Sequence, residues 1–178
     1  ETSGWFKNEI TSLDQLRGMK MRFFGLGARV MQKIGVSTQL LAGGDIFPAL
    51  EKGVIDATEF SMPAMDIKYG FYQIAKNNYF PGWHQQVSVS QILMNKKKFE
   101  GLSDANKALV EVGCGDAIHH TYAETEYVNP FAMVEMGEKH GVVVRRWKDD
   151  QLAVFEKAWN EVVAEDSKTD PVFKRVNE

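Results

Sequence analysis

The segment Gly43–Glu59, with the sequence GGDIFPALEKGVIDATE, decides the fold of this chain. It contains a short amphipathic turn that runs into Gly53, the kind of residue that ends a helix in a left-handed conformation. An apolar strand follows, and it finishes in Thr58 and Glu59, two polar groups at the point where a buried segment should end. A helix followed directly by a strand is typical of α/β sheets, in which ligands bind at the strand ends.

A second strand-like run upstream, KMRFF, carries a cation at Arg22. A guanidinium has a fixed fork of donors that matches a carboxylate and stays charged at any relevant pH. An arginine within an apolar strand is costly unless it is paired. Arg22 therefore binds an anion, forms an internal ion pair with an Asp or Glu, or points to solvent.

Glu59 has the same ambiguity. A carboxylate at a strand end can coordinate a hard cation through its oxygens, or it can be an ordinary surface carboxylate. Together, Arg22 in one strand and Glu59 at the end of another suggest a site for a small anion, with or without a cation.

Strand and helix patterns alternate along the rest of the chain and predict an α/β fold with a largely parallel sheet. Strands are expected over residues 19–24, 37–41, 54–59, 86–95 and 142–144. Helices are expected to begin at Ser12 and to cover residues 28–34, 45–52, 62–76, 103–129, 130–140, 148–163 and 170–174. Residues 77–83 are expected to form an aromatic loop, and Pro130 is expected to separate two helices.

Length and composition exclude several classes of protein. The 178 residues suffice for one domain with a sizeable core, and a hydrophobic share of 44% with 25% charged residues is ordinary for a globular protein. A net charge of −3 argues against a nucleic-acid binder that relies on phosphate contacts. No apolar run is long enough to span a membrane. Cys114, the single cysteine, excludes an intrachain disulfide.

Three motifs also carry a family resemblance: LRGMKMR at 16–22, ALEKGVIDATE at 49–59 and YFPGW at 79–83. They resemble, in order and spacing, motifs of the extracytoplasmic solute-binding proteins of tripartite ATP-independent periplasmic (TRAP) transporters. The most similar branch binds 2-oxo acids and related small carboxylates. The resemblance covers residues 4–98 clearly and the helical remainder loosely.

The resemblance implies a type II periplasmic-binding-protein architecture. Family members have two lobes, and this chain resembles the C-terminal half: mainly the second lobe, the inter-lobe strands and long C-terminal helices. Within 1–178 we expect the α/β core of the second lobe over about 1–58, inter-lobe strands and the site loop over 59–98, and the helical C-terminal part over 99–178.

The function implied by the resemblance is capture of a small carboxylate, a 2-oxo or 2-hydroxy acid, in the cleft between the lobes, followed by docking on the membrane subunits of the transporter. No bond is broken, so no enzymatic activity is expected. The protein would be periplasmic, although no signal peptide is visible in this chain. Nucleic acid is not an expected partner, whereas a homodimer is one outcome that the family allows.

The resemblance also assigns roles to site residues. Arg22 would clamp the ligand carboxylate, and Glu59 with the backbone carbonyl of Phe60 would hold a sodium or calcium ion that bridges to the ligand. The family often has Trp where this chain has Phe60, which changes the pocket wall but not the carbonyl.

The segment GWHQQ at 82–86 supplies the remaining candidates. Trp83 would cover the apolar part of the ligand, unless it fills an edge of the core. Gln85 stands where the resemblance places an oxygen ligand of the metal, often an acid. A neutral amide there favours a monovalent ion, or no ion, over Ca²⁺. If the match to the family motif is shifted by one residue, Gln86 takes this position in place of Gln85.

Two other classes of function are kept as alternatives. The first is a ligand-sensing domain of a regulator or receptor with the same architecture. The second is a metal-dependent enzyme built on His120 and Glu124, which are four residues apart on an expected helix. No His-Glu-x-x-His pattern or third ligand supports a metal there, and a solvated helix contact explains the pair.

Overall fold

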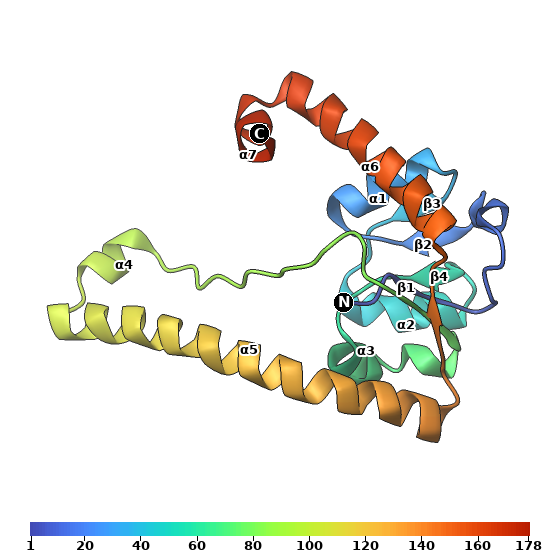
Figure 1. Ribbon diagram of the computed structural model, residues 1–178. Coiled ribbons are helices and arrows are strands. Elements are labelled where there is room, and N and C mark those ends of the chain that lie inside the picture. Colours follow the sequence, from blue (N-terminus) through green and yellow to red (C-terminus); the bar gives the residue numbers. More distant parts are fainter.

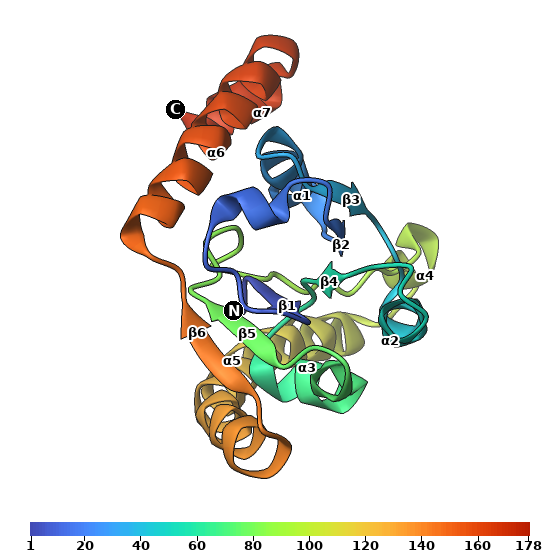
Figure 2. The same ribbon diagram turned by 90° about the vertical axis from the view of Figure 1, so that its right-hand side faces the viewer.

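The computed structural model describes all residues from Glu1 to Glu178. A six-stranded sheet forms the centre, and helices cover both of its faces (Figure 1, Figure 2). The strands are β1 (Gly4–Phe6), β2 (Lys20–Arg22), β3 (Ser37–Gln39), β4 (Ala57–Thr58), β5 (Asn77–Phe80) and β6 (Val143–Arg146). The helices are α1 (Gly25–Lys33), α2 (Gly43–Glu51), α3 (Pro63–Tyr69), α4 (Lys96–Glu100), α5 (Asp104–His140), α6 (Asp149–Thr169) and α7 (Pro171–Asn177), with 3₁₀ turns η1 (Leu13–Leu16) and η2 (Phe71–Gln73).

The strand order is β3-β2-β4-β1-β5-β6. β2 is parallel to both β3 and β4, and β5 is parallel to β6. β1 runs antiparallel to its neighbours β4 and β5. The α/β fold predicted from the sequence is confirmed, and the sheet is mixed because β1 lies in its middle.

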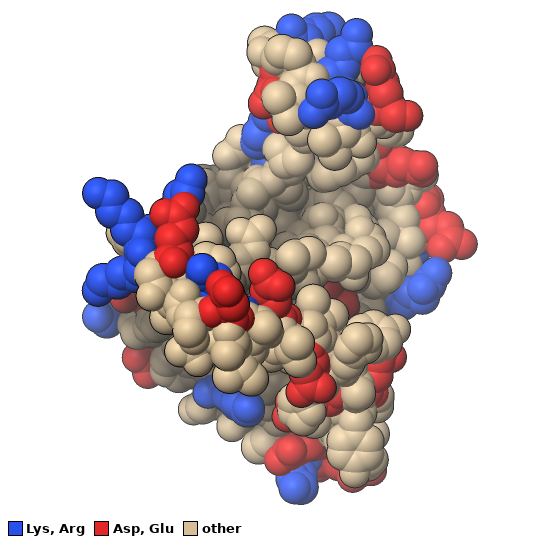
Figure 3. Space-filling model, turned by 90° about the vertical axis from the view of Figure 1, so that its left-hand side faces the viewer, with Lys and Arg blue, Asp and Glu red and all other residues tan.

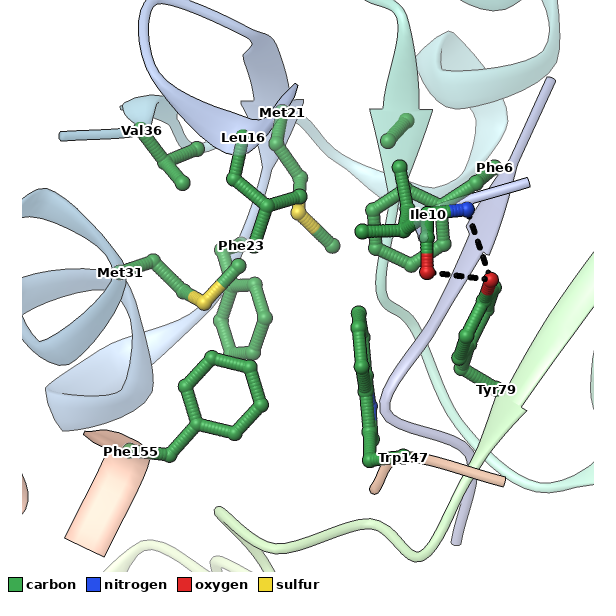
Figure 4. Packing of buried hydrophobic residues seen from close by; sticks show 11 residues of the cluster. Phe6, Ile10, Leu16, Met21, Phe23, Met31, Val36, Tyr79, Trp147 and Phe155 are labelled. Atoms are coloured by element: carbon green, nitrogen blue, oxygen red, sulfur yellow. Dashed lines mark hydrogen bonds between the residues drawn. The ribbon is translucent and has the colours of Figure 1, made fainter. Parts of the chain in front are cut away.

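One face of the sheet packs against α1 and α6. Its largest apolar cluster includes Phe6, Met31, Trp147 and Phe155, each at most 1% exposed (Figure 4). The hydroxyl of Tyr79 accepts a hydrogen bond from the Ile10 backbone N–H at 2.7 Å. Since Trp147 follows β6 and Phe155 lies on α6, this cluster fixes the C-terminal helices to the N-terminal strands.

The other face packs against α2, α3 and the C-terminal end of α5. Its cluster brings together Trp5 from β1, Leu50 from α2, Phe71 from η2 and Met136 from α5, all fully buried. The predicted helix over 45–52 and the strand that follows it are thus part of the core. None of the helices combines the length and the apolar character that a membrane-spanning segment requires.

The prediction of a strand over residues 86–95 is wrong. This segment is extended and runs beside α5 (Figure 1), but it pairs with no other strand. Alternating apolar residues gave the strand pattern, yet a strand forms only by hydrogen bonding to a neighbour. The side chains of Val87, Val89 and Leu93 are more than 70% exposed.

The expected break at Pro130 is also wrong, because α5 continues through it. The side chain of the neighbouring Asn129 lies between α5 and α3. Its amide nitrogen donates to the Thr125 carbonyl at 2.8 Å, and its Oδ1 accepts from the Ala64 backbone N–H at 3.0 Å. Packing against α3 therefore keeps the helix continuous where local propensity alone disfavours it.

Three other predicted elements also have different bounds in the structure. The helix expected over 62–76 is two shorter elements, since α3 ends at Gly70 in the left-handed conformation (φ 74°). The loop expected over 77–83 contains β5. The strand expected over 54–59 is reduced to the two residues of β4.

Candidate functional site

Arg22 and Glu59 lie side by side at the carboxyl ends of two neighbouring parallel strands. Arg22 is the last residue of β2, and Glu59 follows β4 directly. The register pairs Arg22 with Thr58, and the Glu59 backbone N–H donates to the Arg22 carbonyl at 2.9 Å. In α/β sheets this edge is where ligands bind.

The two side chains form a buried ion pair. Arg22 Nη1 is 2.9 Å from Glu59 Oε2, and the side chains are only 7% and 1% exposed. The same nitrogen also donates to the Glu59 carbonyl, and Arg22 Nε donates to the Leu41 carbonyl at 3.3 Å. Burial lowers the pKa of the Arg22 guanidinium, while Glu59 opposes this shift. The hydrogen bonds use Nε and Nη1, which leaves Nη2 for another partner.

Phe60 covers this ion pair. The Arg22 guanidinium carbon lies 5.3 Å from the centre of the Phe60 ring, within the range of a cation–π contact. The ring is held in place by Tyr69, with centroids 4.6 Å apart, and by Phe71. A side chain at Gly43 would come within 3.0 Å of the Phe60 ring, so this glycine allows α2 to approach it closely.

His84 lies next to Oε1 of Glu59, the carboxylate oxygen that accepts no hydrogen bond from Arg22. The sequence did not indicate it as a site residue. Its Nε2 is 3.4 Å from Glu59 Oε1, and its side chain is 2% exposed. Both ring nitrogens are buried without a hydrogen-bond partner. Phe23 packs edge-on against the ring at a centroid distance of 4.8 Å. The local sequence contains no signal for this burial, because it depends on Phe23 and Gly27, which lie about 60 residues away.

Glu1 joins Glu59 and His84 in a cluster of groups that can ligate a metal. One ligand atom from each of the three lies within 4.8 Å of the others. Burial raises the pKa of the Glu1 carboxyl, and the nearby Glu59 adds to this effect. Two carboxylates beside an unpartnered imidazole are suitable donors for a cation, so the residues present fit the ion that the family resemblance implies.

Trp83 and Gln85 lie in the loop after β5. Trp83 stacks on Phe155, with ring centroids 4.9 Å apart, and on Phe23 at 6.0 Å. It therefore packs at the edge of the core while remaining partly exposed. Gln85 donates to the Ser88 hydroxyl at 2.6 Å. The structure thus brings together Arg22, Glu59 and Phe60. Trp83 contacts the rings of Phe23 and His84. Gln85 bonds within its own loop and does not contact this group through a hydrogen bond.

Asp66 is a second buried carboxyl near the ion pair, and the sequence did not single it out. It is fully buried, and its Oδ2 accepts hydrogen bonds from Trp5 Nε1 at 2.7 Å and from the Thr2 hydroxyl at 3.2 Å. Its Oδ1 has no partner. Burial raises the pKa of Asp66 to about 7, and the nearby Glu59 also raises it.

The alternative metal site at His120 and Glu124 is an exposed contact on α5. His120 Nε2 and Glu124 Oε2 are 3.5 Å apart, and both side chains are more than half exposed. No third ligand gathers there; the one group of metal-ligating side chains is the cluster at Glu59.

Gly27 is required by the packing behind the site. A Cβ at this position would lie 2.5 Å from Phe23 Cε1 and 3.1 Å from His84 Cβ. Gly27→Ala is therefore expected to destabilise the fold by about 1–3 kcal/mol through overpacking. Chemical denaturation measures this loss. Gly44→Ala is the matched control, since nothing lies within 4 Å of its added Cβ, and it should leave stability unchanged or raise it. Equal effects of the two substitutions would contradict this explanation.

Comparison with known proteins places the chain in a family. The family model described as DctP, bacterial extracellular solute-binding protein, family 7, matches residues 1–169. The Monocarboxylate 2-oxoacid-binding periplasmic protein of Nostoc sp. is 30% identical over all 178 residues, which correspond to 49% of that protein.

Several solved structures are similar over 99% of this chain, among them two that contain a cation with a small acid. One is a TRAP transporter solute-binding protein from Bordetella bronchiseptica, a dimer with copurified calcium and picolinate; it is 33% identical, with a TM-score of 0.88 and 52% of its chain covered. The other, from Pseudoalteromonas atlantica, has bound sodium and pyruvate; it is 25% identical, with a TM-score of 0.91 and 54% covered.

This chain thus spans about half the length of the relatives that it matches. The match of the family model nevertheless extends through the sheet, the Arg22–Glu59 edge and the helices up to the end of α6. The chain belongs to the DctP family, the bacterial extracellular solute-binding proteins of family 7.

Proposed function

We propose that this chain is the C-terminal half of a TRAP-transporter solute receptor that captures a small carboxylate, a 2-oxo or 2-hydroxy acid. The observation that carries the proposal is the buried Arg22–Glu59 pair at adjacent carboxyl ends of β2 and β4. A desolvated guanidinium at this edge, with one terminal nitrogen unused, is suited to bind a carboxylate. The Nostoc relative is named for 2-oxoacid binding, and the Pseudoalteromonas relative holds pyruvate, which supports this class of ligand.

In this proposal Arg22 anchors the ligand carboxylate, and Glu59 with the Phe60 carbonyl holds a sodium or calcium ion. When bound, the ion supplies positive charge for an oxygen of the ligand. Gln85 would complete the ion's ligands only after giving up its hydrogen bond to Ser88. Trp83 and Phe60 would line the pocket, and the exposed part of Trp83 is consistent with this role.

The other half of the protein would supply the opposite wall of the cleft. The exposed apolar side chains in 87–94 and on the first half of α5 support this, because extended apolar surface at such positions is typical of an interface. Seen from the side on which α4 and α5 project, the surface is hollowed beneath the C-terminal helices and is lined mainly by uncharged atoms (Figure 3). We therefore assign 1–58 to the core of the second lobe, 59–98 to inter-lobe strands and the site loop, and 99–178 to the helical C-terminal part.

Transport then needs no chemical step. The two lobes would close on the ligand, a hinge motion driven by tighter binding to the closed state, and the closed form would dock on the membrane subunits of the transporter. We place the protein in the periplasm, as its family relatives are. A homodimer is a further expectation, supported by the dimer of the Bordetella relative.

Titration of the full-length protein by calorimetry tests the proposal. Pyruvate, lactate and longer 2-oxo acids are added with calcium present and again after treatment with a chelator. We expect one-to-one binding of at least one of them, and weaker binding after the ion is removed. Absence of binding across the whole set would contradict the proposed ligand class. Unchanged affinity after chelation and in Glu59→Ala would rule out the bound ion.

A further inference from the structure

The two charged groups expected to bind ligand and cation neutralise each other in this structure. Arg22 Nη1 is the only hydrogen-bond donor to the Glu59 carboxylate, at 2.9 Å from Oε2. The other oxygen, Oε1, accepts no hydrogen bond; His84 Nε2 lies 3.4 Å from it, and both nitrogens of that buried ring lack a hydrogen-bond partner. Breaking such a buried pair without a replacement is strongly unfavourable.

A ligand carboxylate that binds Arg22 therefore competes with the Glu59 carboxylate. Glu59 already occupies Nη1, so an incoming carboxylate shares one guanidinium with a buried carboxylate of like charge. Asp66, fully buried near Arg22, adds to the negative character of the site when it is ionised. Two or three carboxylates around one cation repel each other most strongly where water is excluded.

Binding of a cation without the carboxylate is also unfavourable, for the opposite electrostatic reason. The ligating atoms of Glu59, Glu1 and His84 lie within 4.8 Å of one another, but the Glu59 carboxylate is already neutralised by Arg22. An ion that binds alone places a second positive charge beside a buried guanidinium. With Glu1 ionised, the Arg22, Glu59 and Glu1 side chains together carry one net negative charge. Calcium alone brings this sum to one net positive charge and a carboxylate alone to two net negative charges, whereas both together bring it to zero.

We propose that carboxylate and cation bind by a charge-neutral exchange, in which the ligand takes Arg22 from Glu59 and the cation takes Glu59 from Arg22. This inference rests on the proposed function and adds its regulation: the receptor binds a carboxylate weakly unless the cation is also bound. Binding of the two is positively cooperative, and by linkage each raises the affinity of the other by the same factor.

The test is a linkage measurement on the full-length protein with pyruvate and calcium as probes. The dissociation constant of pyruvate is measured with and without saturating calcium, and that of calcium with and without saturating pyruvate. We expect the two ratios to be equal and to lie in the range of about 5–150-fold that such couplings span. Dissociation constants that do not depend on the other ligand would overturn the exchange. Failure to bind pyruvate under any condition would instead reject the proposed function.

Glu59→Gln separates exchange from a simple metal bridge. The amide keeps the shape of the side chain but no longer competes as an anion for Arg22. The exchange predicts that Glu59→Gln binds pyruvate more tightly than chelated wild type and is indifferent to calcium. A simple bridge predicts the affinity of chelated wild type, and that result would contradict the exchange. Glu51→Gln, on the exposed end of α2, is the matched control and should keep the wild-type linkage. Should Glu59→Gln fail to fold, a crystal structure of wild type with pyruvate and calcium decides instead. A broken Arg22–Glu59 pair supports the exchange, and a retained pair overturns it.

Discussion

Replacement of Arg22 by alanine is expected to lower the affinity of the full-length protein for pyruvate by about 30-fold to several thousand-fold. Truncating one partner of a buried, hydrogen-bonded charge pair costs about 2–5 kcal/mol. Arg22 is 6% exposed and lies at the carboxyl end of β2, where it pairs with Glu59 at 2.9 Å. Calorimetric titration of pyruvate with calcium present measures the loss.

Two variants control for indirect effects of Arg22→Ala. Arg22→Lys keeps the charge but loses the planar fork of donors, so it should recover only part of the affinity. Arg17→Ala removes an exposed arginine that contacts Asp14 at 3.2 Å, and it should bind as wild type does. The unpaired Glu59 is expected to lower the stability of Arg22→Ala. A thermal unfolding measurement is therefore needed to show that this variant is folded. A folded Arg22→Ala protein with wild-type affinity would show that Arg22 is not the anchor.

The second large effect is a pH dependence of stability that originates at Asp66. Burial raises its folded-state pKa from 3.8 to about 7. The folded state therefore holds a proton that the unfolded state has lost between about pH 4 and pH 7. Because the folded state binds more protons in this window, the free energy of unfolding falls as the pH rises through it. The difference between the pKa values of Asp66 in the two states corresponds to about 4 kcal/mol.

Denaturation of wild type and Asp66→Asn at a series of pH values checks this effect. The amide cannot ionise, so the difference in unfolding free energy between the two proteins should change steadily between pH 4 and pH 7 and be constant above it. Asp116→Asn alters an exposed carboxylate on α5 and should produce no such trend. Parallel pH profiles for wild type and Asp66→Asn would mean that Asp66 does not titrate in this range.

The main features of the fold could be predicted because they are local. The helix, glycine and strand within 43–59 are read directly from the sequence, and they correspond to α2, Gly53 and β4. The placement of Glu59 at a strand end follows from the same patterns, whereas Arg22 was expected inside a strand over 19–24 and is the last residue of β2. Their contact required one more fact, the parallel pairing of β2 with β4, which brings adjacent strand ends together.

β5 was missed because its first two residues do not look like those of a buried strand. Two consecutive asparagines, Asn77 and Asn78, lie in the interior of the sheet. Their side-chain amides donate to the backbone carbonyls of Lys7 and Gly4 at 3.1 and 3.3 Å. Burial of such residues is tolerable only with these partners, and the partners lie about 70 residues away in the sequence.

His84 and Asp66 could not be predicted as parts of the site for a related reason. An aspartate is usually exposed and a histidine is only sometimes buried. Here His84 is enclosed by Phe23 and Trp83, and Asp66 by Trp5 and Thr2. Such enclosure is a property of the tertiary structure, so the sequence could indicate Arg22 and Glu59 but not the groups that surround them.

A crystal structure of the full-length protein grown with pyruvate and calcium tests most directly that Arg22 is the carboxylate anchor. The predicted result is a pyruvate carboxylate within hydrogen-bond distance of the Arg22 guanidinium and calcium bound to the Glu59 carboxylate. Persistence of the Arg22–Glu59 pair beside a bound pyruvate would contradict the exchange alone. Pyruvate bound without any contact to Arg22 would contradict the assignment of this site.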